Sequence, residues 1–257
     1  MHKIFINVMK KTLFLFILAG AFLAACGGQQ RPEGNDEANI YKTLPGDSTR
    51  YGLACDGSTD SILVFLPYGA TRLDTFDIIT AFQNHKIFGR PHIGDDLAVI
   101  VNPEDTVEAL MVINLERLQG TWCYMVTPTL RHLDNMSKRM QRRMMERIPD
   151  SLYKQWMAPR EYSLRLKSDH GVIARGGTYR QTTTDDMTPV EFPAIKRYTD
   201  WHIYNGRLIL KADTIAGFTQ EGDVPTTDTV NIVMLHRDTL VLQFPDHEQS
   251  YYRKEKE

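Results

Sequence analysis

The chain of 257 residues is 42% hydrophobic and 24% charged, which is the balance of a soluble globular protein with room for one large or two ordinary domains. Its 30 Lys and Arg stand against 32 Asp and Glu, a net charge of −2. General nucleic-acid binders carry a basic surplus, so this balance argues against that function.

The first 25 residues have the pattern of a secretory signal. Residues 12–25 carry no charge and are rich in Leu and Phe, and Lys10 and Lys11 precede them. A positive segment before a short apolar one is typical of export signals, and this run is shorter than the about 20 residues that span a bilayer. Met9 directly precedes the two lysines, so translation starts at either Met1 or Met9.

The signal ends in Leu23-Ala24-Ala25-Cys26, which resembles the lipobox of bacterial lipoproteins. The resemblance implies cleavage before Cys26, lipidation of its thiol and stable anchoring through two or more acyl chains. The alternative is an ordinary signal with an accidental cysteine. We expect a lipid-anchored protein of the cell envelope, in the outer membrane. Acidic residues at 33–37 are compatible with the cell surface, and the periplasmic face stays open.

The expected mature chain begins with a flexible linker. Residues 26–50 are rich in Gly, Gln, Pro, Asn and Asp and poor in large apolar side chains. Cleavage before Cys26 would leave 27 basic residues (30 minus Lys3, Lys10 and Lys11) against 32 acidic ones. This acidic surplus suits a soluble envelope domain and again gives no indication of a nucleic-acid partner.

Residues 51–117 show short apolar runs separated by turn residues. We expect strands at 61–66, 73–79, 96–101 and 107–115. Several short strands at this spacing predict a small β sandwich or barrel. The segment shows no catalytic or metal-ligand pattern.

Residues 118–257 begin with Leu118-Gln119-Gly120-Thr121-Trp122, which we expect to open a strand running to Val126. Gly-x-Trp at the start of a first strand is similar to the lipocalin signature, in which the Trp closes the barrel floor. The resemblance implies a C-terminal antiparallel β-barrel, and with the preceding module a mainly β fold.

A helical insertion is expected after this first strand. Thr127 and Pro128 are a good N-cap and first helical residue, and an apolar stripe runs from Leu130 to Ile148. A second short helix is expected at 151–156. Strand, two helices and then strands resembles the fatty-acid-binding barrels, relatives of lipocalins. The basic outer face, from Arg131 to Arg147, either rests on anionic lipid or is a solvated surface.

The remaining strands alternate apolar and polar residues. Residues 162–167 alternate, and Trp201 and Ile203 share one face with Tyr198 and Tyr204 on the other. Asn205-Gly206 is a strong signal for a two-residue hairpin. Further strands are expected at 208–210, at 230–235 with Val230, Ile232 and Met234 on one face, at 240–244 and at 249–253.

Four residues are the candidate ligand-binding side chains of the barrel. Arg253 lies on the last expected strand, where the resemblance implies an Arg that either stacks on the floor Trp or holds a ligand carboxylate. Trp122, Trp201 and Tyr204, together with Tyr179, would line a cavity. Ordinary core packing explains the aromatic residues equally well, because small barrels are often filled by their own side chains.

Cys55 and Cys123 are the two cysteines outside the signal. In an exported protein they either form a disulfide that links the two halves of the chain or stay as free buried thiols, and the sequence leaves both open.

The sequence carries no nucleophile elbow, zinc-protease, Walker or Cys-x-x-Cys motif, and its histidines share no metal-ligand spacing. We therefore expect no enzyme, no metal and no cofactor. The leading hypothesis is a non-catalytic envelope lipoprotein whose barrel binds an apolar or amphipathic small molecule. The alternative is a structural or interaction lipoprotein with a filled barrel that contacts other envelope components. A cavity of at least about 300 Å³ would favour the first.

Overall fold

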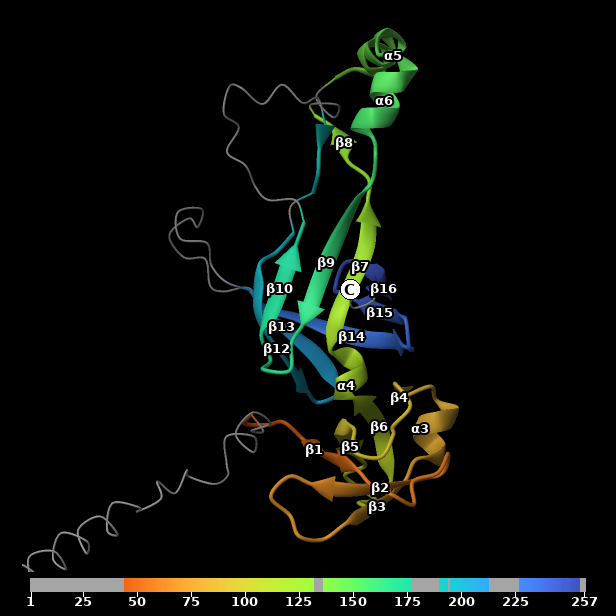
Figure 1. Ribbon diagram of the computed structural model, residues 1–257, viewed down its shortest axis with the longest axis vertical. Coiled ribbons are helices and arrows are strands. Elements are labelled where there is room, and N and C mark those ends of the chain that lie inside the picture. The colour runs from red at the N-terminus through yellow and green to blue at the C-terminus, as the bar shows by residue number, and fades with distance from the viewer. Residues whose placement is uncertain (1–43, 132–135, 177–189, 194, 213–226, 255–257) are drawn as a thin grey trace, which may run out of the picture. The chain divides into compact units, whose positions relative to one another are not determined.

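The computed structural model describes residues 44–131, 136–176, 190–193, 195–212 and 227–254. All of them belong to one compact unit of residues 40–257. The expected signal, the lipidation site Cys26, most of the linker and Tyr179 lie outside the described residues. The fold is mainly β, as expected, and is built from two large sheets (Figure 1).

The first sheet has six strands in the order β3-β2-β1-β5-β6-β4. All pairs are antiparallel except β4 with β6. A bridge between Asp77 and Glu108 brings the end of β3 to the start of β6, so the sheet curls toward a small barrel. The elements are β1 (Thr49–Ala54), β2 (Ile62–Pro67), β3 (Asp74–Asp77), α3 (Ile79–Gln83), β4 (Ile87–Phe88), β5 (Asp96–Val101) and β6 (Ala109–Asn114).

Alternation along these strands builds a core inside the curl. Leu63 and Phe65 of β2 are buried against Phe76 of β3, and Leu97 and Val99 of β5 join them. The strand expected at 73–79 is wrong at its end, because the chain turns into α3 after Asp77. The Asp77 carboxylate accepts a hydrogen bond from the backbone N–H of Ile79, 2.8 Å away, which favours a turn over a further strand residue.

The second sheet forms a nearly closed antiparallel barrel of eight strands in the order β10-β9-β7-β16-β15-β14-β13-β12. The last strand pairs with the first, and β10 and β12 are joined by a single bridge, Gly171 to Asp200. This confirms the expected lipocalin-like barrel. Its strands are β7 (Gly120–Val126), β9 (Arg160–Leu166), β10 (Val172–Arg175), β12 (Tyr198–Tyr204), β13 (Arg207–Ala212), β14 (Thr227–Leu235), β15 (Thr239–Gln243) and β16 (Glu248–Arg253).

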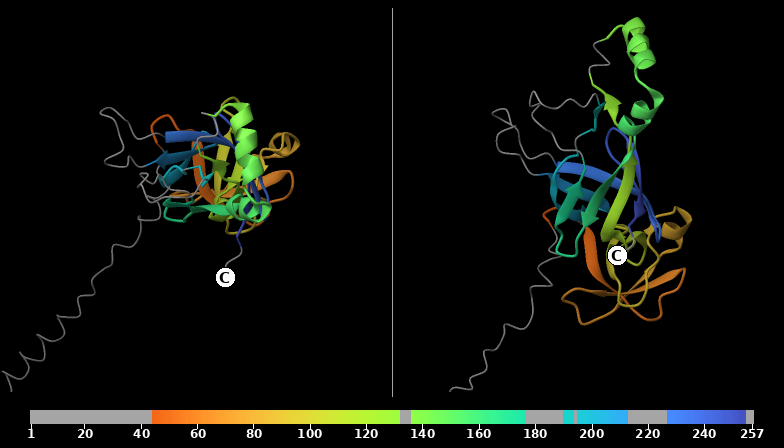
Figure 2. Two further views of the ribbon diagram at one scale, coloured as in Figure 1. Left: turned by 90° about the horizontal axis from the view of Figure 1, so that it is seen from above. Right: turned by 45° about the horizontal axis from the view of Figure 1, so that its top comes forward.

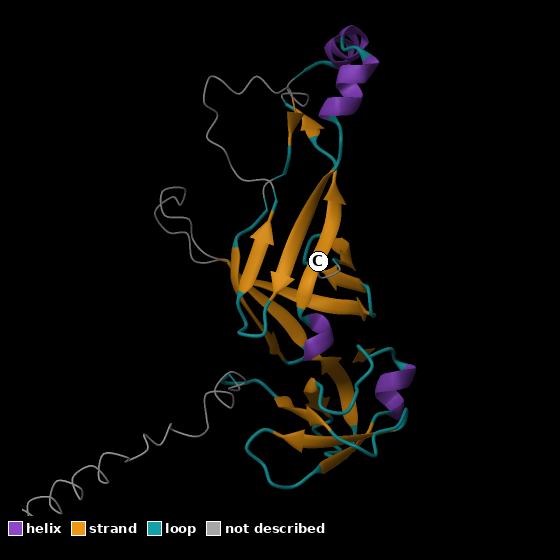
Figure 3. Cartoon of the chain, in the orientation of Figure 1, coloured by secondary structure: helices purple, strands orange, loops and turns teal. Residues whose placement is uncertain are grey.

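The helical insertion lies between β7 and β9, as expected, and extends beyond one end of the barrel (Figures 2 and 3). The helix expected from Thr127 is wrong in its first part. It begins at Lys138, because Thr129–Leu130 instead pair with Val190–Glu191. The additional elements are α4 (Leu115–Leu118), β8 (Thr129–Leu130), α5 (Lys138–Arg147), α6 (Asp150–Trp156) and β11 (Val190–Glu191).

Two short helices thus interrupt the barrel meander, and Leu118 ends a helical turn instead of opening β7. Within the described ranges, no helix is both long and apolar enough to cross a membrane.

Two β-bulges change which side chains enter the barrel. An irregularity between Tyr198 and Asp200 turns Tyr198 inward, so that it is buried together with Trp201. A second one between Ile232 and Met234 buries Leu235 and leaves Met234 exposed. A bulge adds one residue to one strand and thereby breaks the strict period of two. The faces expected for Tyr198 and Met234 are wrong for this reason.

The two sheets share one core at one end of the barrel. Phe88, Ala98 and Ile113 of the first sheet pack in the same buried cluster as the barrel side chains. The β12–β13 hairpin reaches this junction through Asn205-Gly206, both with positive φ (48° and 76°), as the sequence predicts. The N-terminal sheet therefore covers one end of the barrel, and a ligand would have to enter elsewhere.

Candidate ligand-binding site

Trp122 and Arg253 close one end of the barrel. Trp122 is fully buried, and its indole Nε1 donates to the Leu118 carbonyl at 2.8 Å. The Arg253 guanidinium lies over the indole ring, 4.1 Å from the centroid. Its Nη1 donates to the Gln119 carbonyl at 2.8 Å, its Nε to the Arg237 carbonyl at 2.9 Å, and its Nη2 to the Arg117 carbonyl.

Every guanidinium nitrogen of Arg253 is therefore engaged with backbone. Of the two roles that the sequence leaves open, this geometry matches the Arg that stacks on the floor Trp.

The geometry of the closed end requires a glycine at position 120. Its φ is +132°, and a Cβ at this position would collide with Nη1 of Arg253. Glycine alone adopts such a backbone conformation without strain. The Gly-x-Trp motif is thus a backbone and packing requirement of the closed end.

The other two candidates also serve the framework. Trp201 is 1% exposed, and its Nε1 donates to the Lys167 carbonyl at 2.9 Å. The Tyr204 hydroxyl donates to the Pro45 carbonyl at 3.3 Å, where the N-terminal sheet begins. Neither residue borders the cavity described next, so these two side chains stabilise the barrel and its junction with the first sheet.

A cavity of about 720 Å³ occupies the other end of the barrel. Strand β7 links the two ends: Trp122 points into the floor, and Tyr124 and Val126 line the cavity. The lining residues combine aromatic and aliphatic side chains with a few polar ones. They are Tyr124, Met125, Val126, Thr127, Tyr162, Leu164, Pro193, Ile195, Lys196, Tyr198, Asp228, Phe244, Pro245, Asp246, His247, Gln249 and Tyr251.

Four tyrosines from four strands form much of the wall. Tyr124 lies between two of them, with ring centroids 5.6 Å from Tyr162 and 5.1 Å from Tyr251, both edge to face. The Tyr162 hydroxyl donates to the Pro193 carbonyl at 2.7 Å, and the Tyr198 hydroxyl donates to Asp228 at 2.6 Å. The wall therefore presents ring faces and edges together with several hydroxyls.

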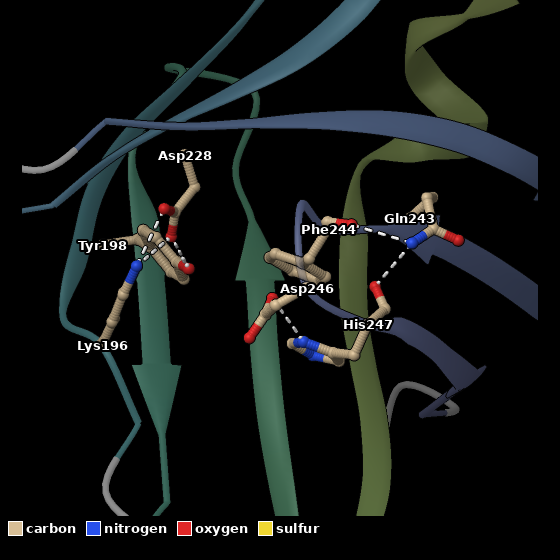
Figure 4. A network of polar contacts seen from close by, with 7 residues as sticks. All are labelled: Lys196, Tyr198, Asp228, Gln243, Phe244, Asp246 and His247. Atoms are coloured by element: carbon tan, nitrogen blue, oxygen red, sulfur yellow. Dashed lines mark hydrogen bonds and ion pairs between the residues drawn. The ribbon is translucent and has the colours of Figure 1, made fainter.

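Two pairs of ionisable side chains line the cavity mouth, where Lys196, Asp246 and His247 are each more than half exposed (Figure 4). On one side Lys196 Nζ lies 2.8 Å from both carboxylate oxygens of Asp228. On the other, the His247 ring nitrogen lies 2.8 Å from Asp246, and the His247 ring stacks on Phe244. The ionisable groups of the mouth are thus arranged as pairs.

Gln243 stabilises the turn that carries the second pair. Its side-chain nitrogen donates to the carbonyls of Phe244 and His247, at 2.8 and 3.1 Å (Figure 4). The backbone N–H of Phe244 also donates to the His247 carbonyl. The β15–β16 turn is therefore a defined part of the cavity rim.

Burial shifts the phenols of the wall toward the neutral form. It raises the pKa of Tyr124 to about 12, with the neighbouring Tyr162 adding to the shift. Burial also raises the pKa of Tyr251 and Tyr198, and hydrogen bonding to Asp228 adds to the shift at Tyr198. These hydroxyls stay protonated at neutral pH, so each can donate a hydrogen bond.

Cys55 and Cys123 are free thiols, which is the second of the two arrangements expected from the sequence. Cys123 is fully buried in β7, whereas Cys55 is half-buried beside the first sheet and donates to the Leu53 carbonyl at 3.7 Å. In the part of the chain that is described, no three His, Cys, Asp or Glu side chains are grouped as a metal site.

The residues of the cavity were missed in the sequence. Tyr162, Tyr124 and Tyr251 stand at inward positions of their strands, where an aromatic side chain usually means core. Their hydroxyls were the available signal, since Phe would serve a filled core equally well. Tyr198 could not be found, because the bulge that turns it inward leaves no simple mark in the sequence.

Comparison with protein families finds a match of residues 183–255 to a lipocalin-like family. The matched segment covers β12 to β16, which carry Tyr198, Asp228 and Tyr251. It supports a C-terminal lipocalin-like domain. Comparisons with curated proteins and with solved structures gave no match.

Proposed function

We propose that this protein is a non-catalytic lipoprotein of the cell envelope whose C-terminal barrel binds an apolar or amphipathic small molecule. The observation that carries the proposal is the cavity of about 720 Å³ inside a lipocalin-like barrel. Small-molecule sites commonly have volumes of about 300 to 1,000 Å³ and apolar walls with a few placed polar groups.

The distribution of side chains supports binding. Trp122 and Arg253 close one end of the barrel and the N-terminal sheet covers it, so the cavity has a closed floor. Its wall is largely aromatic and aliphatic, and its ionisable side chains are arranged as the pairs Lys196–Asp228 and Asp246–His247. Such a wall favours an apolar body, and such a mouth tolerates a polar end.

Native mass spectrometry of residues 27–257 tests the binding proposal, because this piece keeps the compact unit of residues 40–257 whole. Purified without detergent, it should carry added mass that is lost on denaturation, or acquire such mass after incubation with a lipid extract. A Val126→Trp variant places an indole in the cavity and should reduce this binding. Val233→Trp, on an exposed strand position, is the matched control.

A parent chain that stays bare with lipid extracts and fatty acids would contradict ligand binding. The structural or interaction role would then become the better proposal, and crosslinking in intact cells would look for its partner.

The membrane anchor is supported by the lipobox Leu23-Ala24-Ala25-Cys26 and the polar linker behind it. Two or more acyl chains give stable anchoring, and residues 27–39 would separate the folded unit from the bilayer, whereas Thr49 and Arg50, the end of the expected linker, already belong to β1. Labelling of cells with radioactive palmitate should mark the parent protein and leave Cys26→Ala unmarked. Protease treatment of intact cells would then distinguish the cell surface from the periplasmic face of the outer membrane.

A further inference from the structure

We infer that the cavity selects amphiphiles whose buried polar group is an uncharged oxygen acceptor, such as a ketone, ester or amide carbonyl, bound by the hydroxyls of Tyr124 and Tyr251. This inference rests on the proposed function and specifies its ligand class. It excludes an ionised carboxylate as the buried group.

The hydroxyls of Tyr124 and Tyr251 have no hydrogen-bond partner among the described residues, whereas those of Tyr162 and Tyr198 do. Tyr251 is 6% exposed, so its ring is deeply buried. Within the described part of the chain, no fully hidden side-chain oxygen or nitrogen lacks a partner. The Tyr251 hydroxyl therefore reaches open space, and the space beside it is the cavity.

The rings of Tyr124 and Tyr251 are in direct contact beside the cavity. The rings of Tyr124 and Tyr251 meet edge to face at 5.1 Å, and both residues line the same cavity. The Tyr124 phenol adds to the burial that raises the pKa of Tyr251, as expected for two phenols in one neighbourhood. Two neutral donors beside one cavity match an acceptor oxygen, which has two lone pairs.

The ionisable side chains of the cavity disfavour a buried carboxylate. Besides the tyrosines, the ionisable side chains of the lining are Lys196, Asp228, Asp246 and His247, and they form the pairs Lys196–Asp228 and Asp246–His247. Lys196 is already bound by both oxygens of Asp228, whose side chain is 13% exposed. An ionised ligand carboxylate beside the phenols would thus share the cavity with the buried carboxylate of Asp228. Lys196 could not offset its charge, because Asp228 already binds this side chain. Burial of an unpaired charge is much more costly than burial of a neutral carbonyl.

The apolar part of the ligand would contact the remaining wall. Leu164 and Phe244 lie in the same lining as the tyrosines, and the rings of Tyr162 and Tyr124 meet edge to face. Of the four wall tyrosines, Tyr162 and Tyr198 have hydroxyls that are already bonded within the protein, which leaves those of Tyr124 and Tyr251 to bind a polar group of the ligand. An uncharged carbonyl on an apolar chain is therefore complementary to the site.

The test compares 2-nonanone, nonanoate and nonane, which share chain length and differ in the polar group. Their affinities for residues 27–257 are measured at pH 7 by displacement of the uncharged fluorophore N-phenyl-1-naphthylamine. For the parent we expect 2-nonanone to bind at least about 10-fold more tightly than nonanoate. Tyr124→Phe and Tyr251→Phe should each weaken 2-nonanone about 2- to 10-fold, the value of one neutral hydrogen bond, and change nonane less than about 2-fold.

Tyr162→Phe is the matched control, because its hydroxyl donates to the Pro193 carbonyl. It should change the affinities for 2-nonanone and nonane by the same factor. Tighter binding of nonanoate, or equal losses for ketone and alkane in Tyr124→Phe and Tyr251→Phe, would overturn the inference and leave ligand binding intact. If neither the fluorophore nor any of the three compounds binds the folded parent, the proposed function fails and the inference falls with it.

Discussion

Replacement of Arg253 by Ala should destabilise the barrel and leave ligand affinity unchanged. The change removes three charged donors from the carbonyls of Arg117, Gln119 and Arg237 and the stack on Trp122. Each charge-assisted hydrogen bond contributes about 1.5 to 3 kcal/mol when well buried, and a cation over an indole about 1. Because the side chain is half-buried and the contacts are not additive, we expect a loss of about 3 kcal/mol in the free energy of unfolding.

Urea unfolding followed by tryptophan fluorescence measures this loss, since Trp122 and Trp201 are both buried in the barrel. Arg253→Lys keeps the charge and loses the planar fork, so about half of the destabilisation should remain. Arg165→Ala, at an exposed position of β9, is the control and should change stability by about 0.5 kcal/mol or less. If Arg253→Ala unfolds like the parent and loses affinity for the ligand, then Arg253 anchors a ligand and the floor assignment is wrong.

Three further predictions concern the backbone, pH and the thiols. Gly120→Ala should cost about 2 kcal/mol or more, and Gly69→Ala, also at positive φ but with open space around it, should cost less; both are read from urea midpoints. Burial lowers the pKa of His170 below 6.5 in the folded protein. As the pH falls through 6.5, His170 therefore gains a proton in the unfolded chain before it does so in the folded one, which favours unfolding. Stability should therefore decline from about pH 6.5 toward the lower folded pKa, and His170→Asn, which tolerates the positive φ, should reduce this decline. Burial raises the pKa of the Cys123 thiol, so a thiol reagent should label Cys55 first and Cys123 only on unfolding; two unreactive cysteines in the denatured, unreduced chain would show a disulfide instead.

Features that depend on neighbouring residues were predictable from the sequence. Asn205-Gly206 forms the expected hairpin, because a two-residue turn requires positive φ at both positions. Tyr162, Leu164 and Leu166 share the buried face of β9, as their spacing of two indicates. The barrel itself was predictable from Gly-x-Trp, because both residues are needed at the closed end. Trp122 fills it, and Gly120 leaves room for the Arg253 side chain that stacks on Trp122.

Features that depend on residues far apart in the sequence were not predictable. Thr129–Leu130 form a strand because they pair with Val190–Glu191, about sixty positions later, and this pairing overrides a good local helix signal. The bulge after Tyr198 was not predictable either, although β13 follows β12 directly, because it is defined by the register between the two strands. A pattern of apolar residues indicates which side chains are buried, but it does not indicate where a β-bulge shifts the register between two strands.

The barrel is filled by side chains at one end and contains a cavity at the other. Strand β7 carries Trp122 on its inner face at the floor and Tyr124 two residues later at the cavity, so one strand serves both ends. At the floor the indole fills the space, and the carbonyls of Leu118 and Gln119 satisfy the polar groups of the tryptophan and of Arg253. At the other end phenols take the place of the indole. The hydroxyls of Tyr124 and Tyr251 have no partner among the described residues there and are available to bind a ligand. Stability and binding should therefore be separable by position, with substitutions at Trp122 changing mainly the unfolding free energy and those at Tyr124 mainly ligand affinity.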